Sequence, residues 1–564
     1  MEDHLGKRMK SSCDRLSELP KSILHNILCF LPQEHAVQTC ALSKSWRDIG
    51  CTRPKIEFHH DPYEGDAPFK RDEDKFLLVL NKTLQGYHDR GLSVQDFLVE
   101  ICRFGPKIIS LLEKWIPIVL LNMGVKRFHL EFFSDKFDMP SVLLETKSLE
   151  ELHLGHCRIT YPDKLLSTKL RILSLDFVDI GDEALRQIMS GCPLMEHVSL
   201  CGCQGLTSIK AHNSNLKHFE YIDPQGDNVV IDIDAPSLES IRIMSQSRWL
   251  YLGKSFMHLK SVHLEYLVLN QKFFDMCSAD LCCLEDLEMH SCSGLEEFQL
   301  SSRSIKRLRF RVGSPTKAVL DLPNILFLQL DCIVFPSISL STDSSEWRSE
   351  IHLMRPLIPN NDNEAASFFD KLHELHRALG HSRISMHMRV FNLDLAFSHE
   401  GLGELPVIES LTVEKDFTLF YLKAFFIYFF GKFRPRYVEQ SVDAVFETEE
   451  YEEEPDPYDE EEYEEEPDPY DEEEYEPPRP VSVTKKYGGV NELVDRLCDM
   501  FLMESERENY YWWQDLEEVS VEAHDDDGKK WRPLQGANIS EWGLPNNVDH
   551  QIRFRLKWRG SSLD

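Results

Sequence analysis

The chain has 564 residues, of which 42% are hydrophobic, and its formal net charge is −34. Residues 447–476 contain twenty Asp and Glu and no Lys or Arg, so subtracting 20 from 34 leaves −14 for the rest. This length fits several domains or one long repetitive domain. The absence of a chain-wide basic surface argues against nucleic-acid binding.

The N-terminal residues MEDHLGKRMKSSCDRL contain no apolar segment of the kind that directs secretion. The fifteen cysteines form no CxxC pair and no Cys/His quartet at zinc spacing. We therefore expect free thiols, a reducing compartment and no metal site. The expected location is the nucleus, the cytoplasm or both, and the basic GKRMK segment would aid nuclear import.

The first apolar segment covers residues 19–47 and is interrupted by two prolines. Its spacing predicts a helix between Pro20 and Pro32, a second over 36–41 and a third that carries Trp46. These helices are apolar on more than one face, and a unit of about 40 residues is too small to bury them all. The surplus apolar surface either caps the chain's own repeats or binds another protein.

The middle of the chain repeats the pattern apolar–x–x–apolar–x–apolar. The intervals between successive units are 24, 21, 25, 21, 22, 21, 25, 21 and 20 residues. This period predicts an α/β fold, a leucine-rich-repeat solenoid with a curved parallel sheet. The units start at Val125, Leu149, Leu170, Met195, Leu216, Leu238, Leu259, Leu284, Ile305 and Ile325.

Three cysteines stand eight residues after the start of their units, namely Cys157, Cys203 and Cys292. This position turns inward after the strand, so we interpret them as structural thiols rather than reactive ones.

The pattern weakens after Leu330 and returns in VIESLTV (407–413) and LEEVSV (516–521), with helices expected over 363–380 and 490–503. We interpret 331–564 as irregular terminal repeats with insertions. The aromatic run 417–430 has fourteen residues and contains a lysine. It is too short to cross a membrane, so we expect a buried core helix and no membrane contact.

The insert 450–473 consists of two copies of EYEEEPDPYDEE. Its composition predicts disorder. Its role is either that of an expanded linker or that of a docking segment for a basic partner.

The expected domains follow in chain order. They are a disordered N-terminus (1–13), the helical domain (14–50), a helical linker and cap (51–124), the repeats (125–346), irregular repeats (347–446), the acidic insert (447–480) and a C-terminal cap (481–564).

The phrases LSELP, ILHNILCFLP and AVQTCALSKSWR resemble the F-box motif of plant F-box/leucine-rich-repeat proteins, as does GCPLMEHVSL (191–200) among the repeats. The resemblance implies a three-helix F-box that binds a Skp-type adaptor, and through it a cullin–RING complex, as the substrate-recognition subunit of an SCF ubiquitin ligase. The residues implied to form or support the adaptor surface are Leu19, Pro20, Ile23, Ile27, Leu31, Pro32, Val37, Leu42 and Trp46.

Two alternatives remain open. One is a leucine-rich-repeat scaffold that acts outside a ubiquitin ligase. The other is an enzyme of unknown type, which ranks last because no P-loop, GxSxG, HExxH or GxGxxG motif occurs. No cofactor is expected, and a small ligand in the solenoid stays an open alternative.

The outward residues at offsets two and four of each unit should line the concave face, where an unknown protein substrate would bind. Stacking in register predicts that Asp286 pairs with Arg307 and Glu288 with Arg309. The candidate substrate contacts are therefore Arg242, which we expect to lack such a partner, together with His218 and His263.

Overall fold

The structure is a computed structural model of the full chain, and its parts separate into two compact units. Residues 1–328 and 336–344 form the first unit, and residues 329–335 and 345–564 form the second. The residues described are 19–31, 33–39, 46, 49–50, 52–60, 73–102, 105–133, 136–160, 165–223, 229–246, 250–253, 256–311, 316–332, 335–353, 362–388, 405–413, 426, 429–440, 491–502, 511–524, 530–535 and 551–559.

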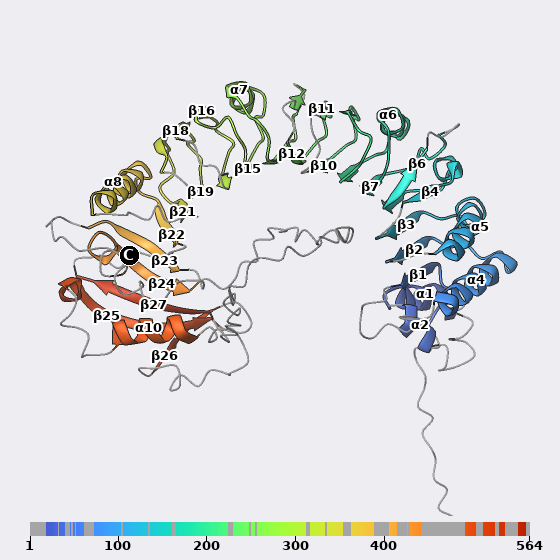
Figure 1. Ribbon diagram of the computed structural model, residues 1–564, viewed down its shortest axis with the longest axis horizontal. Coiled ribbons are helices and arrows are strands. Elements are labelled where there is room, and N and C mark those ends of the chain that lie inside the picture. Colours follow the sequence, from blue (N-terminus) through green and yellow to red (C-terminus); the bar gives the residue numbers. More distant parts are fainter. Residues whose placement is uncertain are drawn as a thin grey trace, which may run out of the picture. The chain divides into compact units, whose positions relative to one another are not determined.

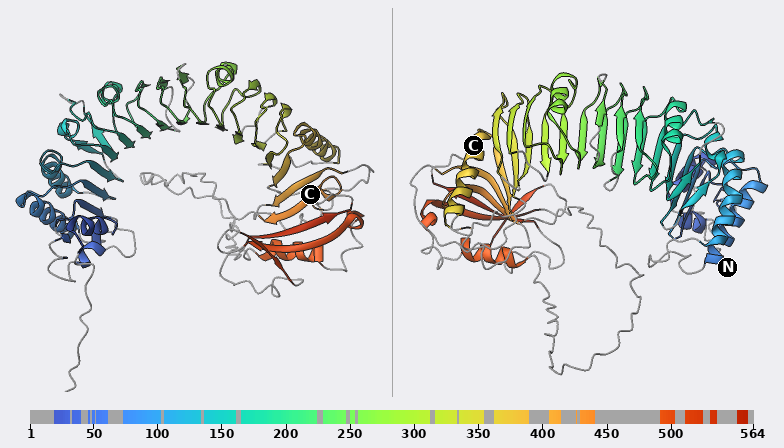
Figure 2. Two further views of the ribbon diagram at one scale, coloured as in Figure 1. Left: turned by 180° about the vertical axis from the view of Figure 1, so that it is seen from behind. Right: turned by 45° about the horizontal axis from the view of Figure 1, so that its top comes forward.

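The first unit is built on one parallel sheet whose strands pair with the next strand of the series (Figures 1 and 2). The ten predicted start positions, from Val125 to Ile325, are all 0% exposed, which confirms the repeat core. The strands are β1 (Lys55–His60), β2 (Asp96–Ile101), β3 (Arg127–Phe132), β5 (Glu151–Gly155), β7 (Ile172–Asp176), β8 (His197–Cys201), β10 (His218–Asp223), β12 (Ser240–Ser245), β14 (Ser261–Glu265), β15 (Asp286–His290) and β17 (Arg307–Arg311).

Helices and short sheets connect these strands. In Figure 1 the longer helices between the strands of this unit lie on the outer side of its curve, whereas the two N-terminal helices lie at its end. The helical elements are α1 (Lys21–Cys29), α2 (Gln33–Thr39), α4 (Glu73–Asp89), α5 (Pro106–Asn122), η1 (Ser141–Glu145), α6 (Asp182–Gly191) and α7 (Gln271–Ala279). The short sheets pair β4 (Phe137–Met139) with β6 (Cys157–Ile159), β11 (Val230–Ile233) with β9 (Ser208–Ala211) and β13 (Leu250–Leu252), and β18 (Lys317–Asp321) with β16 (Glu297–Ser301) and β20 (Ser337–Ser341).

The repeats begin earlier than the sequence analysis placed them. Segment 51–124, expected to be a helical linker and cap, contains β1 and β2 as well as α4 and α5. Val94, Phe97 and Val99 fit the same apolar pattern and are buried. The long helix α5 separates this unit from the one at Val125, so the interval exceeds the usual 20–29 residues and hid the repeat.

The second unit continues with parallel strands and then changes direction. Its parallel strands are β21 (Arg348–Leu353), β22 (Arg383–Met388), β23 (Val407–Val413) and β24 (Arg434–Gln440). The next pairings are antiparallel: β27 (Ile552–Trp558) pairs with β24 and with β25 (Leu516–His524). Strand β25 also pairs antiparallel with β26 (Trp531–Leu534). The match at 407–413 is thus a parallel strand of the repeat type. The interpretation of LEEVSV (516–521) as a repeat is wrong, because β25 belongs to an antiparallel terminal sheet.

The remaining elements are β19 (Phe327–Cys332), α8 (Asp362–Ala378), α10 (Asn491–Leu502) and η3 (Tyr511–Asp515). Both helices expected beyond residue 330 are therefore present. Most of the aromatic run 417–430 lies outside the described residues, but Phe426, Phe429 and Phe430 are helical and fully buried. The ring of Phe430 packs against Trp512 at 4.9 Å, as expected for core residues. The acidic insert 450–473 lies outside the described residues.

Candidate partner-binding surfaces

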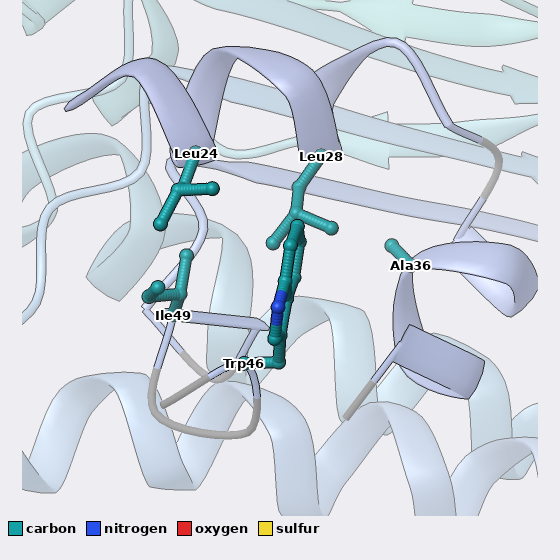
Figure 3. Close-up of a cluster of buried hydrophobic side chains, with 5 residues drawn as sticks. All are labelled: Leu24, Leu28, Ala36, Trp46 and Ile49. Carbon is teal, nitrogen blue, oxygen red and sulfur yellow. The ribbon is translucent and has the colours of Figure 1, made fainter. Parts of the chain in front are cut away.

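The N-terminal helical domain has its own small core, shown in Figure 3. Leu24 and Leu28 of α1 and Ala36 of α2 pack with Trp46 and Ile49, all at most 6% exposed. Leu24 and Leu28 are four residues apart and therefore lie on one face of α1. The core thus uses only one of the apolar faces that the sequence predicted.

A second apolar face of α1 points away from this core. Pro20, Ile23 and Phe30 are exposed and lie at steps of three and seven residues, which places them on a common side. Ile23 is 44% exposed and Phe30 88% exposed. We call these three residues the outer apolar face. Phe30 was missed in the sequence analysis, although it lies seven residues after Ile23, which places it on the face of α1 that carries Ile23.

The other predicted adaptor residues differ in position. Leu19, Ile27 and Leu31 are partly buried against the domain core. Trp46 is only 6% exposed, so it supports the fold of the domain and does not present a surface of its own. Pro32, Leu42 and the side chain of Val37 lie outside the described residues.

Arg53 joins this helical domain to the first repeat strand. Its side chain is buried and its Nη1 donates to the carbonyl oxygens of Leu28 (3.2 Å) and Leu31 (3.3 Å). Its Nε donates to the carbonyl oxygen of Lys55, at the start of β1 (2.9 Å). The cation therefore satisfies carbonyls at the C-terminal end of α1, where positive charge is favoured. One side chain thus links the domain to the sheet.

The concave face carries three rows of side chains, since the strands stack without a shift in register. Two rows, at offsets two and four, were predicted. A third row at offset six was missed because it follows the last apolar position of each unit, and it includes Glu131, Asp176, Glu265, His290 and Arg311.

The predicted ion pairs on β15 and β17 are confirmed. Arg307 lies 2.9 Å from Asp286, and Arg309 lies 3.5 Å from Glu288. Arg309 also reaches Asp286 at 2.9 Å. Opposite charges on these neighbouring strands therefore compensate one another.

The expectation that Arg242 lacks a partner is wrong. Its guanidinium lies 3.5 Å from Glu220 and 3.6 Å from Glu265, because the missed third row supplies the second carboxylate. His263 contacts the same Glu265 at 2.6 Å. Arg242 and His263 therefore belong to one network.

The third predicted contact, His218, lies one row away from these two. Its Nδ1 is 2.7 Å from Ser240 Oγ, and its ring stacks on His197 with a centroid distance of 4.3 Å.

Glu265 is the centre of this network and its side chain is 6% exposed. Burial alone raises the pKa of this carboxyl, but hydrogen bonds from His263 and His290 oppose burial and outweigh it. The pKa of Glu265 therefore lies well below its ordinary value, and the group stays ionised at neutral pH.

A similar network occupies the first strands. His59 of β1 lies between Glu100 (2.7 Å) and Glu57 (3.4 Å), and hydrogen bonds to these carboxylates raise the pKa of His59 to about 10. His129 lies 3.2 Å from Glu131 and 3.6 Å from Glu100. These carboxylates are thus paired with imidazoles on a partly exposed surface.

Aromatic side chains follow several strands at the same edge of the sheet. Phe177 and Tyr266 come directly after β7 and β14, adopt positive φ angles of 53° and 59°, and are each 42% exposed. His156, after β5, has φ 51° and stacks on Phe177 at 4.9 Å. Positive φ is disfavoured for bulky residues. We call Phe177, Tyr266 and His156 the aromatic edge.

The buried cysteines occupy the places predicted for them. Cys157 Sγ lies 3.2 Å from the carbonyl oxygen of Gly155 in its own unit. Cys203 and Cys292 each lie 3.4 Å from a carbonyl oxygen of the preceding unit, that of Leu175 and that of Leu264. Burial raises the pKa of Cys203 and of Cys292 to about 12. All cysteines within the described ranges are unbridged, as expected.

Comparisons with known proteins agree with this arrangement. An F-box domain profile matches residues 16–56, and a profile described as At1g61320/AtMIF1, LRR domain, matches residues 87–309. An F-box/FBD/LRR-repeat protein of Arabidopsis thaliana is 27% identical over 367 residues, which cover 62% of this chain and 70% of that protein. An F-box/LRR-repeat protein of the same plant is 31% identical over 209 residues, which cover 35% of this chain and 40% of the relative.

The chain thus carries an F-box domain followed by leucine-rich repeats, and it is similar to F-box/leucine-rich-repeat proteins of Arabidopsis thaliana. Its F-box is the helical domain with the outer apolar face, and the match to residue 56 takes in Arg53 and the start of β1. The repeat profile begins at residue 87, in agreement with a repeat strand at β2 and not first at β3. Among the described helices, none is long and apolar enough to cross a membrane.

Proposed function

We propose that this F-box/leucine-rich-repeat protein is the substrate-recognition subunit of an SCF-type ubiquitin ligase. In this proposal the F-box binds a Skp-type adaptor and the repeats bind a target protein. The observation that carries it is the outer apolar face, an exposed surface on a domain whose core is already complete without it. Ubiquitin transfer would be performed by the partner subunits, and this chain would supply proximity.

The adaptor interface is proposed to centre on Ile23 and Phe30. An aromatic residue that acts as a hot spot of an interface contributes about 2 kcal/mol or more to binding, which corresponds to about 30-fold in Kd. Replacing an exposed side chain usually changes folding stability by less than about 0.5 kcal/mol. Adaptor binding and folding are therefore separable by mutation at this face.

The test measures binding of the purified full-length protein to a Skp-type adaptor. Ile23→Ala/Phe30→Ala should weaken binding by at least about 30-fold, and Leu19→Ala/Pro20→Ala should also reduce it. Met257→Ala is the matched control, because Met257 is 69% exposed but belongs to the repeats. If the double variants bind as tightly as the parent, the adaptor assignment is wrong. If the parent binds no adaptor, the scaffold alternative is favoured.

The target protein is proposed to bind the concave face near β10, β12 and β14. Arg242, His218 and His263 are retained as contacts, although Arg242 and His263 already lie beside carboxylates of the sheet and His218 contacts Ser240. Tyr266 follows the end of β14 at the aromatic edge and adds an exposed ring, and aromatic rings are frequent binding hot spots. We propose that these side chains recognise the target without a cofactor, in the nucleus or the cytoplasm.

The test uses a target protein whose abundance in plant cells depends on this protein. It should accumulate when the Ile23→Ala/Phe30→Ala variant replaces the parent, because it is bound but not modified. It should be released from the Tyr266→Ala/Arg242→Ala variant, which should still bind the adaptor. Retention of the target by the second variant would place the target site elsewhere.

A further inference from the structure

Four polar side chains converge in the second unit, on strands that the repeat pattern did not mark as functional. Asp331 lies on β19, Glu350 and His352 lie on β21, and His387 lies on β22. His352 and His387 are direct partners in the parallel β21–β22 pair, so their imidazoles project from the same face. Their ring centroids are 4.3 Å apart.

The distances fit a site that holds one small cation. One ligand atom from each of Glu350, His352 and His387 lies within 4.8 Å of the other two. His352 Nε2 is 3.6 Å from Glu350 Oε2, and these atoms make no direct hydrogen bond by the usual limit of about 3.2 Å. The spacing is close to what two ligands of one metal ion require, since each metal–ligand bond is about 2.0–2.2 Å long.

His352 is oriented from its other side. Its Nδ1 faces Asp331 Oδ1 at 3.5 Å, and Asp331 Oδ1 accepts a hydrogen bond from Gln329 Nε2 at 3.0 Å. Asp331 is fully buried, and its carboxylate is therefore fixed in place. A histidine that faces a carboxylate with one nitrogen while the other nitrogen binds the metal is a recurring arrangement in zinc proteins.

A second observation in favour of a metal concerns Nε2 of His352, the nitrogen that faces Glu350. Within the described part of the chain, Nε2 of His352 is buried and has no hydrogen-bond partner. Buried polar atoms are nearly always paired, because removing them from water without a partner costs free energy. A metal ion between Nε2, Glu350 and His387 would satisfy this atom.

We propose that Glu350, His352 and His387 bind a divalent transition metal ion, with Zn²⁺ as the best match. Asp331 is a positioning residue that acts through His352. Two imidazole nitrogens and one carboxylate suit Zn²⁺, whereas Ca²⁺ and Mg²⁺ prefer sites made only of oxygen. Three protein ligands leave a fourth position for water or for a group of a bound partner.

A second cluster of this kind among the described residues, Glu100, His129 and Glu131, fits a metal less well. Its ligand set would contain one imidazole and two carboxylates, and its Glu100 already pairs with His59 at 2.7 Å. It is therefore an ion-pair network in which imidazoles balance the carboxylates, and it supplies an internal comparison for the proposal.

The test uses the full-length protein after removal of metal with a chelator. Zn²⁺ is titrated in competition with a chromogenic chelator, and Co²⁺ absorption reports the ligand type. The parent should bind Zn²⁺ at this site, and His387→Gln or Glu350→Gln should weaken that binding by more than about 10-fold. Asp331→Asn should weaken it by about 10–100-fold and should retain the Co²⁺ bands, since the ligands themselves are unchanged.

His197→Gln is the matched control. His197 stacks on His218 at the same 4.3 Å on another pair of parallel strands, and it makes no ion pair with a carboxylate among the described contacts. This variant should bind Zn²⁺ like the parent. Equal affinity in the parent and His387→Gln would overturn the proposal, as would Co²⁺ absorption typical of thiolate ligands, which would assign the metal to cysteines. Adaptor binding is measured separately, so failure here leaves the proposed function untouched.

Discussion

Replacement of Trp46 by alanine should unfold the F-box while the repeats stay folded. Trp46 packs among Leu24, Leu28, Ala36 and Ile49, and truncation of a buried tryptophan commonly costs about 3–5 kcal/mol. A unit of this size contributes about 2–6 kcal/mol of stability by itself at about 0.05–0.15 kcal/mol per residue. The loss is therefore as large as the stability of the F-box.

Hydrogen exchange of the backbone amides is the appropriate assay because it resolves local unfolding. In Trp46→Ala, amides of α1 should lose protection, whereas those of β7 should keep the parent rates. Phe30→Ala is the control, since this residue is 88% exposed and its removal should leave α1 protected. If α1 exchanges as slowly in Trp46→Ala as in the parent, Trp46 does not hold the F-box together and the core assignment fails.

Three further outcomes are expected. Glu265→Gln should destabilise the repeats by about 1–3 kcal/mol in denaturant melts above about pH 5, and the difference should shrink below about pH 4. The sign follows because the lowered pKa of Glu265 adds stability that is lost as acid protonates it. In the native protein at neutral pH, alkylation should modify exposed Cys282 and spare Cys157 until the chain unfolds, because burial raises the pKa of Cys157; equal rates would refute its inward placement. Deletion of 450–473 should leave the melting temperature unchanged or slightly higher, because it removes self-repelling charge, and a large decrease would mean that the insert is packed.

The repeat architecture was readable from the sequence because each unit must bury the same apolar positions. Val125 and Ile325, at the two ends of the predicted series, are both fully buried. The same periodicity did not reveal the repeat at β2, because α5 lengthens the connection to the next unit. It also predicted a repeat at β25, where six residues match the pattern but the strand pairs antiparallel. A short apolar pattern predicts a strand; it does not specify the direction of the neighbouring strand.

The candidate surfaces were less predictable for a different reason. The partners of Arg242 include Glu265 from the row at offset six, which the six-residue pattern does not contain. Asp331, His352 and His387 stand on three strands without any local spacing motif, so only the stacking of strands reveals their convergence. Resemblance to the F-box motif named Trp46 among the residues that form or support the adaptor surface, and only the structure places it in the core of the domain.

The buried side chain of Arg53 has a mechanical consequence if the chain acts as the ligase subunit proposed above. It fastens the end of α1 to the beginning of β1 through three hydrogen bonds, so the F-box and the first strands turn together. An adaptor that binds the F-box would therefore also fix the orientation of the adjoining repeat sheet relative to the adaptor. A target bound to that sheet would then have a restricted range of positions relative to the partner subunits. Only lysines within that range would reach the site of ubiquitin transfer at high effective concentration. Loosening this joint would then alter which lysines are modified before it altered whether the target is bound.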